Sequence, residues 1–177
     1  MWSFAGSLRP VAAASRPDLL APSVAAALPG DRDAVGVAEI DAALADTAAF
    51  CAHYGIAEAD SANCVVVKGR RAGEVRFAAC VVLATTRTDV NGIVRRRLDV
   101  RSASFAPMAE AVALTGMEYG GITPIGLPED WPVLIDAAVA ASPGVVVGAG
   151  IRGAKLFLPG SMLAALPGAE VIEGLGR

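Results

Sequence analysis

The sequence of 177 residues has only one histidine, His53, and only three cysteines, which lie far apart. A Ser–His–Asp or Cys–His mechanism needs an imidazole beside its nucleophile. His53 stands just before Gly55 near the end of a predicted helix, where a cation is favourable for structural reasons alone. A conventional zinc site would need more histidines or a CxxC pair. We therefore expect no metal and no cofactor, and we interpret Cys51, Cys64 and Cys80 as small buried apolar residues.

Long apolar runs and an excess of positive charge are also missing. No stretch reaches the roughly 18 apolar residues that a membrane helix needs. Arg9, Pro10 and Arg16 interrupt the start where a signal peptide would need a continuous apolar core. The net charge of −3 argues against a protein that coats nucleic acid. Together with reduced cysteines, these absences predict a cytoplasmic protein with neither a membrane nor DNA as a partner.

What the sequence does contain is mostly small and apolar. Hydrophobic residues make up 54% of the chain and aromatic residues only 5%, with much of the apolar content in Ala and Val. This composition and length are typical of one compact α/β domain with its own core. Residues 1–16 are expected to form a loosely held tail, although Trp2 and Phe4 could dock on the body, and residues 17–177 form the domain.

Hydrophobic periodicity and turn residues predict about six strands and four or five helices. The strongest strand is the β-branched run at 64–68, which returns antiparallel through residues 75–86 as the central hairpin of the sheet. Such a mixture predicts a mixed α/β fold. The other expected strands are 35–40, 133–136, 145–148 and 155–158, while 102–105 is either a short strand or an extended link and 171–172 could add a last strand. The expected helices are 17–28, 41–54, 88–98, 107–114 and 160–166.

A glycine-rich loop at residues 116–128 packs four Gly and two Pro between two apolar runs. Such a loop could be a tight connection between a helix and a strand. It could also follow an unusual path whose free N–H groups point at a ligand. A second glycine-rich loop, residues 148–153, could supply the other wall of one small pocket and bring Arg152 to it.

Charged residues offer two more candidates. Basic side chains gather around the hairpin and the helix after it, where they could form a solvated face or contact RNA phosphates locally. Asp136 follows an apolar strand, so it either faces solvent or accepts hydrogen bonds from a nearby loop. The basic residues selected as possible RNA contacts are Lys68, Arg70, Arg71, Arg95, Arg96 and Arg97.

The order of these parts resembles the YbaK/prolyl-tRNA-synthetase-associated domain family of aminoacyl-tRNA editing domains. The resemblance covers roughly residues 40–172. It depends most on the sequence Gly-Gly-Ile-Thr-Pro-Ile-Gly at 120–126, followed at a suitable distance by Asp136 and by Gly-Ile-Arg-Gly at 150–153.

The resemblance implies a mixed, mostly antiparallel and barrel-like sheet of six or seven strands flanked by helices. It also implies hydrolysis of the ester between a wrong amino acid and tRNA, most often the proline tRNA. Water and the 2′-OH of the tRNA would act in place of a protein nucleophile, and loop N–H groups could stabilise the oxyanion. The implied partners are the acceptor end of aminoacyl-tRNA and an aminoacyl-tRNA synthetase.

Site residues follow from the same resemblance. The implied catalytic group is Gly121, Asn63 and Asp136, and the implied substrate-binding group is Gly120, Ile122, Thr123, Pro124, Gly150 and Arg152.

Asn63 is a departure from the family pattern. Many members carry a functional lysine at the start of the first hairpin strand, at the position that matches Asn63 in this chain. An amide can hydrogen-bond a ribose or a carbonyl but supplies no charge. Lys68 lies five residues on and would face the other side of a regular strand. Two functions therefore stay open: a freestanding deacylase that edits in trans, and a module of the same fold that binds an aminoacyl-adenosine-like ligand or a protein without hydrolysis.

Overall fold

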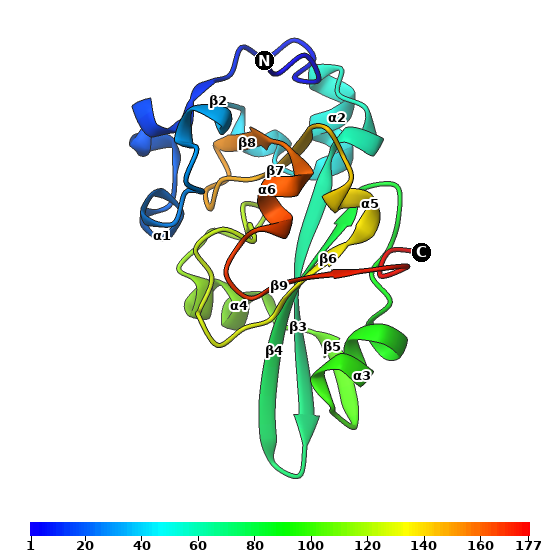
Figure 1. Ribbon diagram of the computed structural model, residues 1–177. Coiled ribbons are helices and arrows are strands. Elements are labelled where there is room, and N and C mark those ends of the chain that lie inside the picture. Colours follow the sequence, from blue (N-terminus) through cyan, green and yellow to red (C-terminus); the bar gives the residue numbers. More distant parts are fainter.

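A long β-hairpin is the longest regular feature of the computed structural model, which describes residues 1–177 (Figure 1). Strands β3 (Ala62–Arg71) and β4 (Glu74–Leu83) pair without a bulge from one end to the other. The turn consists of Ala72 and Gly73, which both have positive φ values of 49° and 85°. A two-residue turn of this kind matches the twist of antiparallel strands, so it holds the hairpin in one register.

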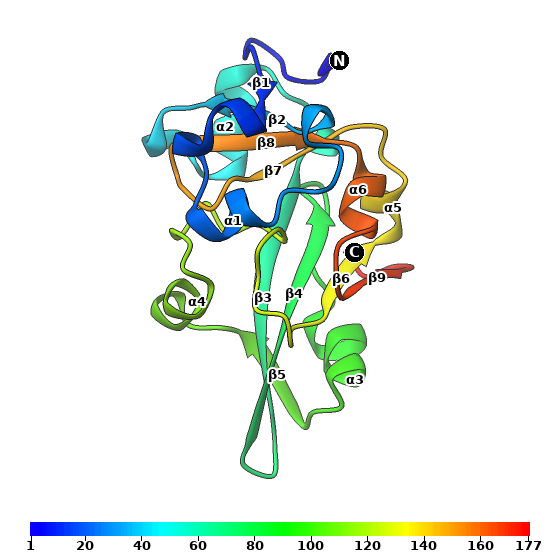
Figure 2. The same cartoon turned by 60° about the vertical axis from the view of Figure 1, so that its left-hand side comes forward.

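The strands form two sheets. The five-stranded sheet has the order β5-β3-β4-β6-β9, in which β6 and β9 run parallel to their neighbours. The four-stranded sheet, β1-β2-β8-β7, is antiparallel throughout and lies across one end of the hairpin (Figure 2). The added strands are β1 (Val11–Ala12), β2 (Gly36–Glu39), β5 (Ser102–Phe105), β6 (Val133–Asp136), β7 (Val145–Gly148), β8 (Ala154–Leu158) and β9 (Ala169–Ile172).

The predicted fold class, a single mixed α/β domain, is confirmed, but its strands are divided between two sheets. Strand β5 pairs with β3 only from Val67 to Arg70, so the first half of that β3 edge has no strand beside it. A single bridge between Ser61 and Val146 connects the two sheets there. The sheet therefore opens at the start of β3 instead of continuing around the domain.

Six α-helices cover the sheets. Asp46 caps α2 by accepting a hydrogen bond from the Ala48 N–H at 3.2 Å, and Gly55 ends that helix with a φ of 68°. The expected helix at 41–54 is thus two pieces, since Asp41 caps a separate 3₁₀ turn at Ala42–Leu44. The helices are α1 (Pro22–Ala26), α2 (Thr47–Tyr54), α3 (Arg95–Leu98), α4 (Met108–Thr115), α5 (Ala137–Ala140) and α6 (Gly160–Ala164).

Proline shortens the first predicted helix. The residue before a proline avoids the helical region, and Ala21, before Pro22, is extended with φ −61° and ψ 148°. The expected helix at 17–28 is therefore a 3₁₀ turn, Pro17–Leu19, followed by the short α1. Strand β1 and helix α5, at residues that the sequence analysis left without regular structure, are additional elements.

Residues 1–16, expected to be a loose tail, instead pack on the four-stranded sheet. The Trp2 ring covers Gly36, where a Cβ atom would lie 2.6 Å from the ring. The Phe4 ring covers Gly144 in the same way and lies 6.0 Å from the Phe157 ring, centroid to centroid. Aromatic rings in the first residues therefore fill space that two glycines leave open.

The main hydrophobic core contains 23 buried residues, including Val37, Ile125, Leu156 and Leu163, and draws on both sheets. None of the helices combines the length and the apolar character that crossing a membrane requires.

Asp136 generates a prediction about stability. At the end of β6 its Oδ1 accepts from the Ala138 N–H at 2.8 Å and its Oδ2 from the Gly176 N–H at 2.7 Å. Because Asp136→Ala leaves both donors without this acceptor, we expect it to lower the free energy of unfolding by about 2 kcal/mol. Urea denaturation should show this loss, whereas the exposed Asp130→Ala control should stay near wild type. Equal stability of the two variants would contradict the capping role.

Candidate functional site

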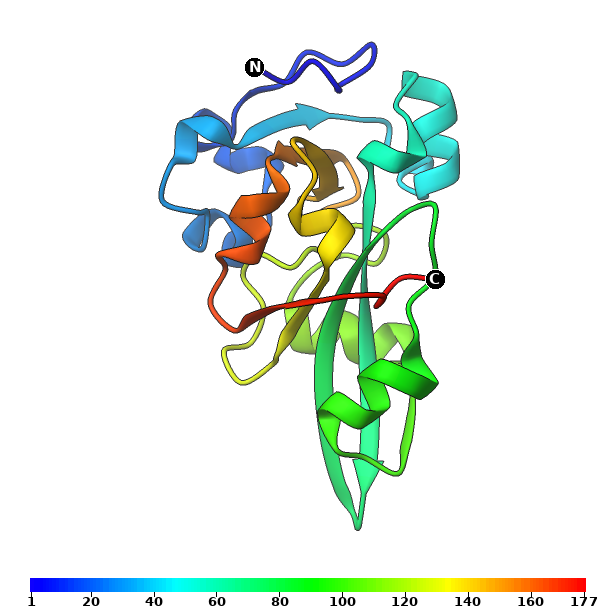
Figure 3. The ribbon, with the colours of Figure 1, turned by 45° about the vertical axis from the view of Figure 1, so that its right-hand side comes forward.

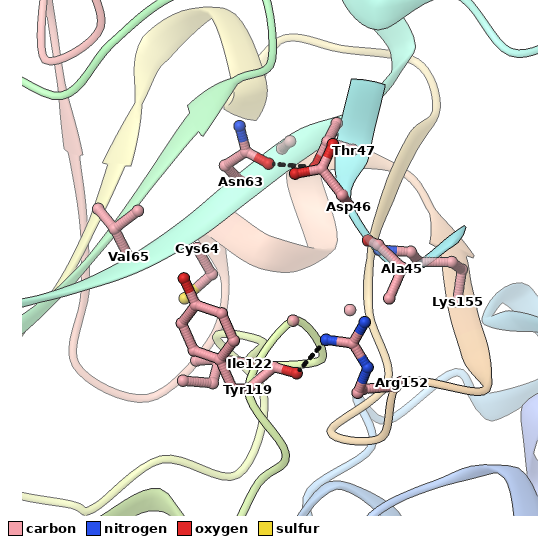
Figure 4. A pocket seen from close by; sticks show the side chains of 13 residues that line it. Ala45, Asp46, Thr47, Asn63, Cys64, Val65, Tyr119, Ile122, Arg152 and Lys155 are labelled. Carbon is pink, nitrogen blue, oxygen red and sulfur yellow. Dashed lines mark hydrogen bonds between the residues drawn. The ribbon is translucent and has the colours of Figure 1, made fainter. Parts of the chain in front are cut away.

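A cavity of about 430 Å³ lies beside the open start of β3 (Figure 4). Its walls come from β3, the glycine-rich loop after α4, the ends of β7 and β8, and the turn that leads into α2. The residues that line it are Ala45, Asp46, Thr47, Ala62, Asn63, Cys64, Val65, Tyr119, Gly120, Ile122, Gly148, Arg152 and Lys155.

The two glycine-rich loops contact each other backbone to backbone. The Gly150 N–H donates to the Gly121 carbonyl at 2.7 Å, and the Glu118 N–H donates to the Gly150 carbonyl at 2.9 Å. A Cβ atom at Gly121 would lie 2.6 Å from the carbonyl of Ile151. A Cβ atom at Gly148 would lie 2.4 Å from the carbonyl oxygen of Gly121. Side chains at these positions would force the loops apart, so the glycines set the shape of this wall.

Arg152 ties the loop wall to the turn before α2. Its guanidinium donates from Nη1 to the Tyr119 carbonyl at 2.9 Å and from Nη2 to the Ala42 carbonyl at 3.1 Å. Gly120 has a φ of +85°, and a Cβ atom there would lie 2.6 Å from Nη1 of Arg152. The guanidinium therefore crosses directly over Gly120 and forms no ion pair within the chain.

Asn63 faces the cavity from the second position of β3. Its Oδ1 accepts a hydrogen bond from the Thr47 hydroxyl at 2.6 Å, as Figure 4 shows. Its Nδ2 makes no hydrogen bond within the protein, so the amide keeps two N–H donors for a ligand.

Lys155 is the amine of the cavity. It comes from the buried strand β8 and is only 7% exposed. Its Nζ donates to the Ala45 carbonyl at 3.1 Å and lies 5.1 Å from the centre of the Phe50 ring. Burial lowers the pKa of Lys155 and outweighs the opposing effects of Cys51 and Asp46, and the charge of Arg152 adds a smaller lowering.

Neither the cysteine in the cavity nor the single histidine of the chain is an activated nucleophile. Burial raises the pKa of the Cys64 thiol to about 12, so it is uncharged at neutral pH. His53 is exposed on α2 and does not line the cavity. Chemistry in this cavity would therefore depend on hydrogen-bond donors and cations around a bound water and ligand.

Two backbone N–H groups of the first loop have no acceptor. Those of Gly120 and Ile122 make no hydrogen bond in the protein, whereas the Gly121 N–H donates to the Glu118 carbonyl at 2.9 Å. Both free groups belong to residues that line the cavity. If the loop stabilises an oxyanion, Gly120 and Ile122 are its available donors and Gly121 is the support beneath them.

The structure brings together some of the predicted site residues and separates others. Asn63, Gly120, Ile122 and Arg152 line the cavity. Gly121 and Gly150 form the backbone contact behind it. The others lie elsewhere: Thr123 is buried, Pro124 lines a different hollow, and both carboxylate oxygens of Asp136 bind backbone N–H groups away from the cavity.

The basic residues around the hairpin are divided into paired and free groups. Lys68 forms a 2.7 Å ion pair with Glu110. It lies on β3, which pairs regularly there, and does not line the cavity. Arg71 pairs with Asp99, and Arg97 pairs with Glu170. The exposed side chains without an ion pair in this set are Arg70, on β3 near the hairpin tip, and Arg95 and Arg96, on α3. Figure 3 shows α3, the lower green helix, beside the hairpin.

Two parts of the cavity were not expected from the sequence, the turn before α2 and the amine of Lys155. Residues 45–47 were treated as helix interior, although Asp46 followed by Thr47 is a recognisable helix start. Lys155 was treated as a strand terminus, although a lysine beside Leu156, Phe157 and Leu158 signals a buried charge that needs a reason.

Comparisons with known proteins agree with this geometry. A family model described as an aminoacyl-tRNA editing domain matches residues 41–166. No curated protein matches the chain. Among solved structures, a proposed trans-editing enzyme for prolyl tRNA synthetase shares 24% identity and a TM-score of 0.73, covering 89% of this chain and 96% of that one.

Two further structures share the fold. A scaffold protein used for computational epitope backbone grafting has 23% identity and a TM-score of 0.67, covering 81% of this chain and 87% of its own. A hypothetical protein has 24% identity and a TM-score of 0.65, with 75% and 85% covered. Identities this low establish the fold alone, whereas the family model spans most of the chain. The chain therefore belongs to the aminoacyl-tRNA editing domain family.

Proposed function

We propose that this protein is a freestanding deacylase that hydrolyses the ester of a mischarged tRNA, with a proline-type tRNA as the first candidate. The observation that carries the proposal is the cavity itself. It joins unpaired loop N–H groups to an Asn63 amide, and its one thiol, Cys64, is not activated. This arrangement suits attack by water better than a covalent intermediate.

The proposed reaction begins with the ester carbonyl beside Gly120 and Ile122. Water attacks the carbonyl carbon, and the two free N–H groups stabilise the oxyanion as it develops. The bond between the carbonyl carbon and the ribose oxygen then breaks. The ribose oxygen takes up a proton, with the neighbouring hydroxyl of the tRNA assisting, and the amino acid leaves. Asn63 orients the ribose or the carbonyl through its free Nδ2.

The size of the cavity supports selection of small amino acids. Gly120, Gly148, Ala45 and Ala62 leave little side-chain bulk in the walls, while the loop contact behind them cannot move back. A pocket of fixed size admits a small side chain and excludes a larger one, which is how a second sieve discriminates.

An apolar hollow next to the cavity offers a place for the terminal base. It shares Tyr119 and Ile122 with the cavity and continues over Val66, Phe105 and Met108. Phe105 and Met108 are 60% and 55% exposed. Stacking on such a surface would hold an adenine without reading a hydrogen-bond code.

The unpaired arginines give the tRNA a route along the hairpin. From Asn63 to Arg70 the strand advances seven residues, or roughly 23 Å at the usual rise. Arg70, Arg95 and Arg96 would then meet phosphates of the acceptor stem well away from the ester. The partner protein in this proposal is an aminoacyl-tRNA synthetase of the cytoplasm that releases the mischarged tRNA.

The second candidate function is a binding module that retains the cavity without hydrolysis. Asn63 favours it, because an amide supplies no charge where many relatives carry a lysine. The ligand would be an aminoacyl-adenosine-like molecule held by the same loop.

A panel of mischarged tRNAs tests the deacylase. We expect release of a small amino acid by the wild type and at least a roughly tenfold slower release by Gly121→Ala, because its Cβ would meet the Ile151 backbone at 2.6 Å. Gly153→Ala is the matched control, since nothing lies within 4 Å of a Cβ there. No release by the wild type, beside an active editing enzyme, would refute the function. Normal release by Gly121→Ala would remove the loop contact from the mechanism.

Asn63→Lys distinguishes the two candidate functions. If the wild type already hydrolyses the ester, we expect the variant to slow the reaction, because the longer side chain loses the Thr47 hydrogen bond and occupies the cavity. If the wild type is inactive and Asn63→Lys gains deacylase activity, the binding module is the natural function. Single-turnover release from the same charged tRNA gives the comparison.

Reversing charge on α3 tests the tRNA route. We expect Arg95→Glu combined with Arg96→Glu to weaken tRNA binding roughly tenfold or more at low salt, with a smaller effect at high salt. The matched control is Arg9→Glu with Arg32→Glu, two exposed arginines elsewhere. Filter binding of uncharged tRNA measures the difference, and equal affinities of the two double variants would contradict the route.

A further inference from the structure

Lys155 carries a charge that the packing of the protein does not explain. The residue is only 7% exposed, and an ammonium has three N–H donors. Its hydrogen bond within the chain goes to the Ala45 carbonyl at 3.1 Å, and no carboxylate forms a salt bridge with it. Burying an ammonium without a counter-ion is costly. Since Lys155 also lines the cavity, the missing partner would come from a ligand.

The other charges around the cavity leave this excess uncancelled. Arg152 is a second cation, and its guanidinium hydrogen-bonds only to backbone carbonyls. Asp46 is the one carboxylate in the lining, and its Oδ1 accepts from the Ala48 and Ala49 N–H groups at 3.2 and 3.5 Å. The cavity therefore has two cations for one carboxylate, which already caps a helix.

We propose that Lys155 binds an anionic oxygen of the ligand, supplied either by the phosphate of the terminal nucleotide or by a side-chain carboxylate of the amino acid. This inference deepens the proposed function and rests on it for the identity of the ligand. Lys155 reaches the cavity from β8, across from the start of β3, where Asn63 provides only an uncharged amide (Figure 4). Lys155 then supplies, from another strand, the charge that position 63 lacks.

The surroundings of Lys155 predict how binding depends on pH. The groups that face it are Asp46, Cys51 and Arg152, together with the Phe50 ring. Because burial lowers the pKa of Lys155, the ammonium loses its proton below the ordinary lysine range of about 10.4. Anion affinity should therefore fall as the pH rises toward that range. In Lys155→Arg, which stays charged, affinity should remain nearly constant.

Calorimetry with 5′-AMP and adenosine tests the phosphate source directly and needs no catalysis. We expect the wild type to bind AMP more tightly than adenosine, and Lys155→Met to lose roughly 10- to 100-fold in AMP affinity while adenosine is unaffected. Arg32→Met, which removes an exposed charge elsewhere, should behave as wild type. Lys155→Met should also unfold at the same temperature as the wild type or higher, because it removes a buried unpaired charge. Lys155→Gln replaces it if Lys155→Met does not fold.

Deacylation tests the carboxylate source. If AMP binding does not depend on Lys155, the proposal requires Lys155→Met to lose roughly 10- to 100-fold in release of aspartate from mischarged tRNA, with release of alanine unchanged. Adding Asn63→Lys to Lys155→Met would return a cation from the opposite strand and should recover part of any lost AMP affinity, which is measured without catalysis. Unchanged AMP binding together with unchanged release of both amino acids would overturn the proposal. A wild type that binds AMP through Lys155 but releases no amino acid would refute the deacylase alone.

Discussion

The tightest packing constraint in this molecule is the backbone contact between the two glycine-rich loops. Gly121 lies on the first loop, and Gly148 and Gly150 lie on the second. A carbonyl of one loop accepts from an N–H of the other at 2.7 Å, with no side chain between them. Interiors this tightly packed cannot absorb even one methyl group without displacement. Everything on the cavity side of the contact, including the free N–H groups of Gly120 and Ile122, takes its position from it. The loops therefore act as one rigid wall.

The opposite side of the cavity depends on polar contacts instead. Thr47 bonds Asn63, and Arg152 spans from the loop to the turn before α2. These bonds fix distances without filling space, which leaves a volume of about 430 Å³ between the walls. A rigid side with free backbone N–H groups and a hydrogen-bonded charged side suit a ligand with one small uncharged end and one anionic end.

The sequence predicted the fold well where local chemistry decided it. The β-branched run at 64–68 lies within β3. The helices expected at 88–98 and 107–114 are present, with Asp89 as the cap of the first and Gly116 at the end of the second. It predicted the division into two sheets poorly. The division depends on where β5 stops pairing with β3, which is a long-range contact that the local sequence around Val67 does not reveal.

The site shows the same limit. The glycine motif located one wall, and Asn63, Gly120, Ile122 and Arg152 were named in advance. Spacing along the chain could not show that Gly121 supports the wall from behind or that Asp136 bonds Gly176 near the C-terminus. The apolar neighbours of Lys155 mark it as a buried charge, but only the β7–β8 pairing shows that it lies beside Gly148.

The rings of Trp2 and Phe4 occupy the space that side chains at Gly36 and Gly144 would need. Each ring and the glycine beneath it therefore share one space, and the combined volume of the two side chains is limited. In related chains a side chain at position 36 or 144 requires a smaller residue at position 2 or 4, so these pairs should vary together. The first residues of the chain are thus coupled to the core of the domain through the packing of Trp2 and Phe4 against it.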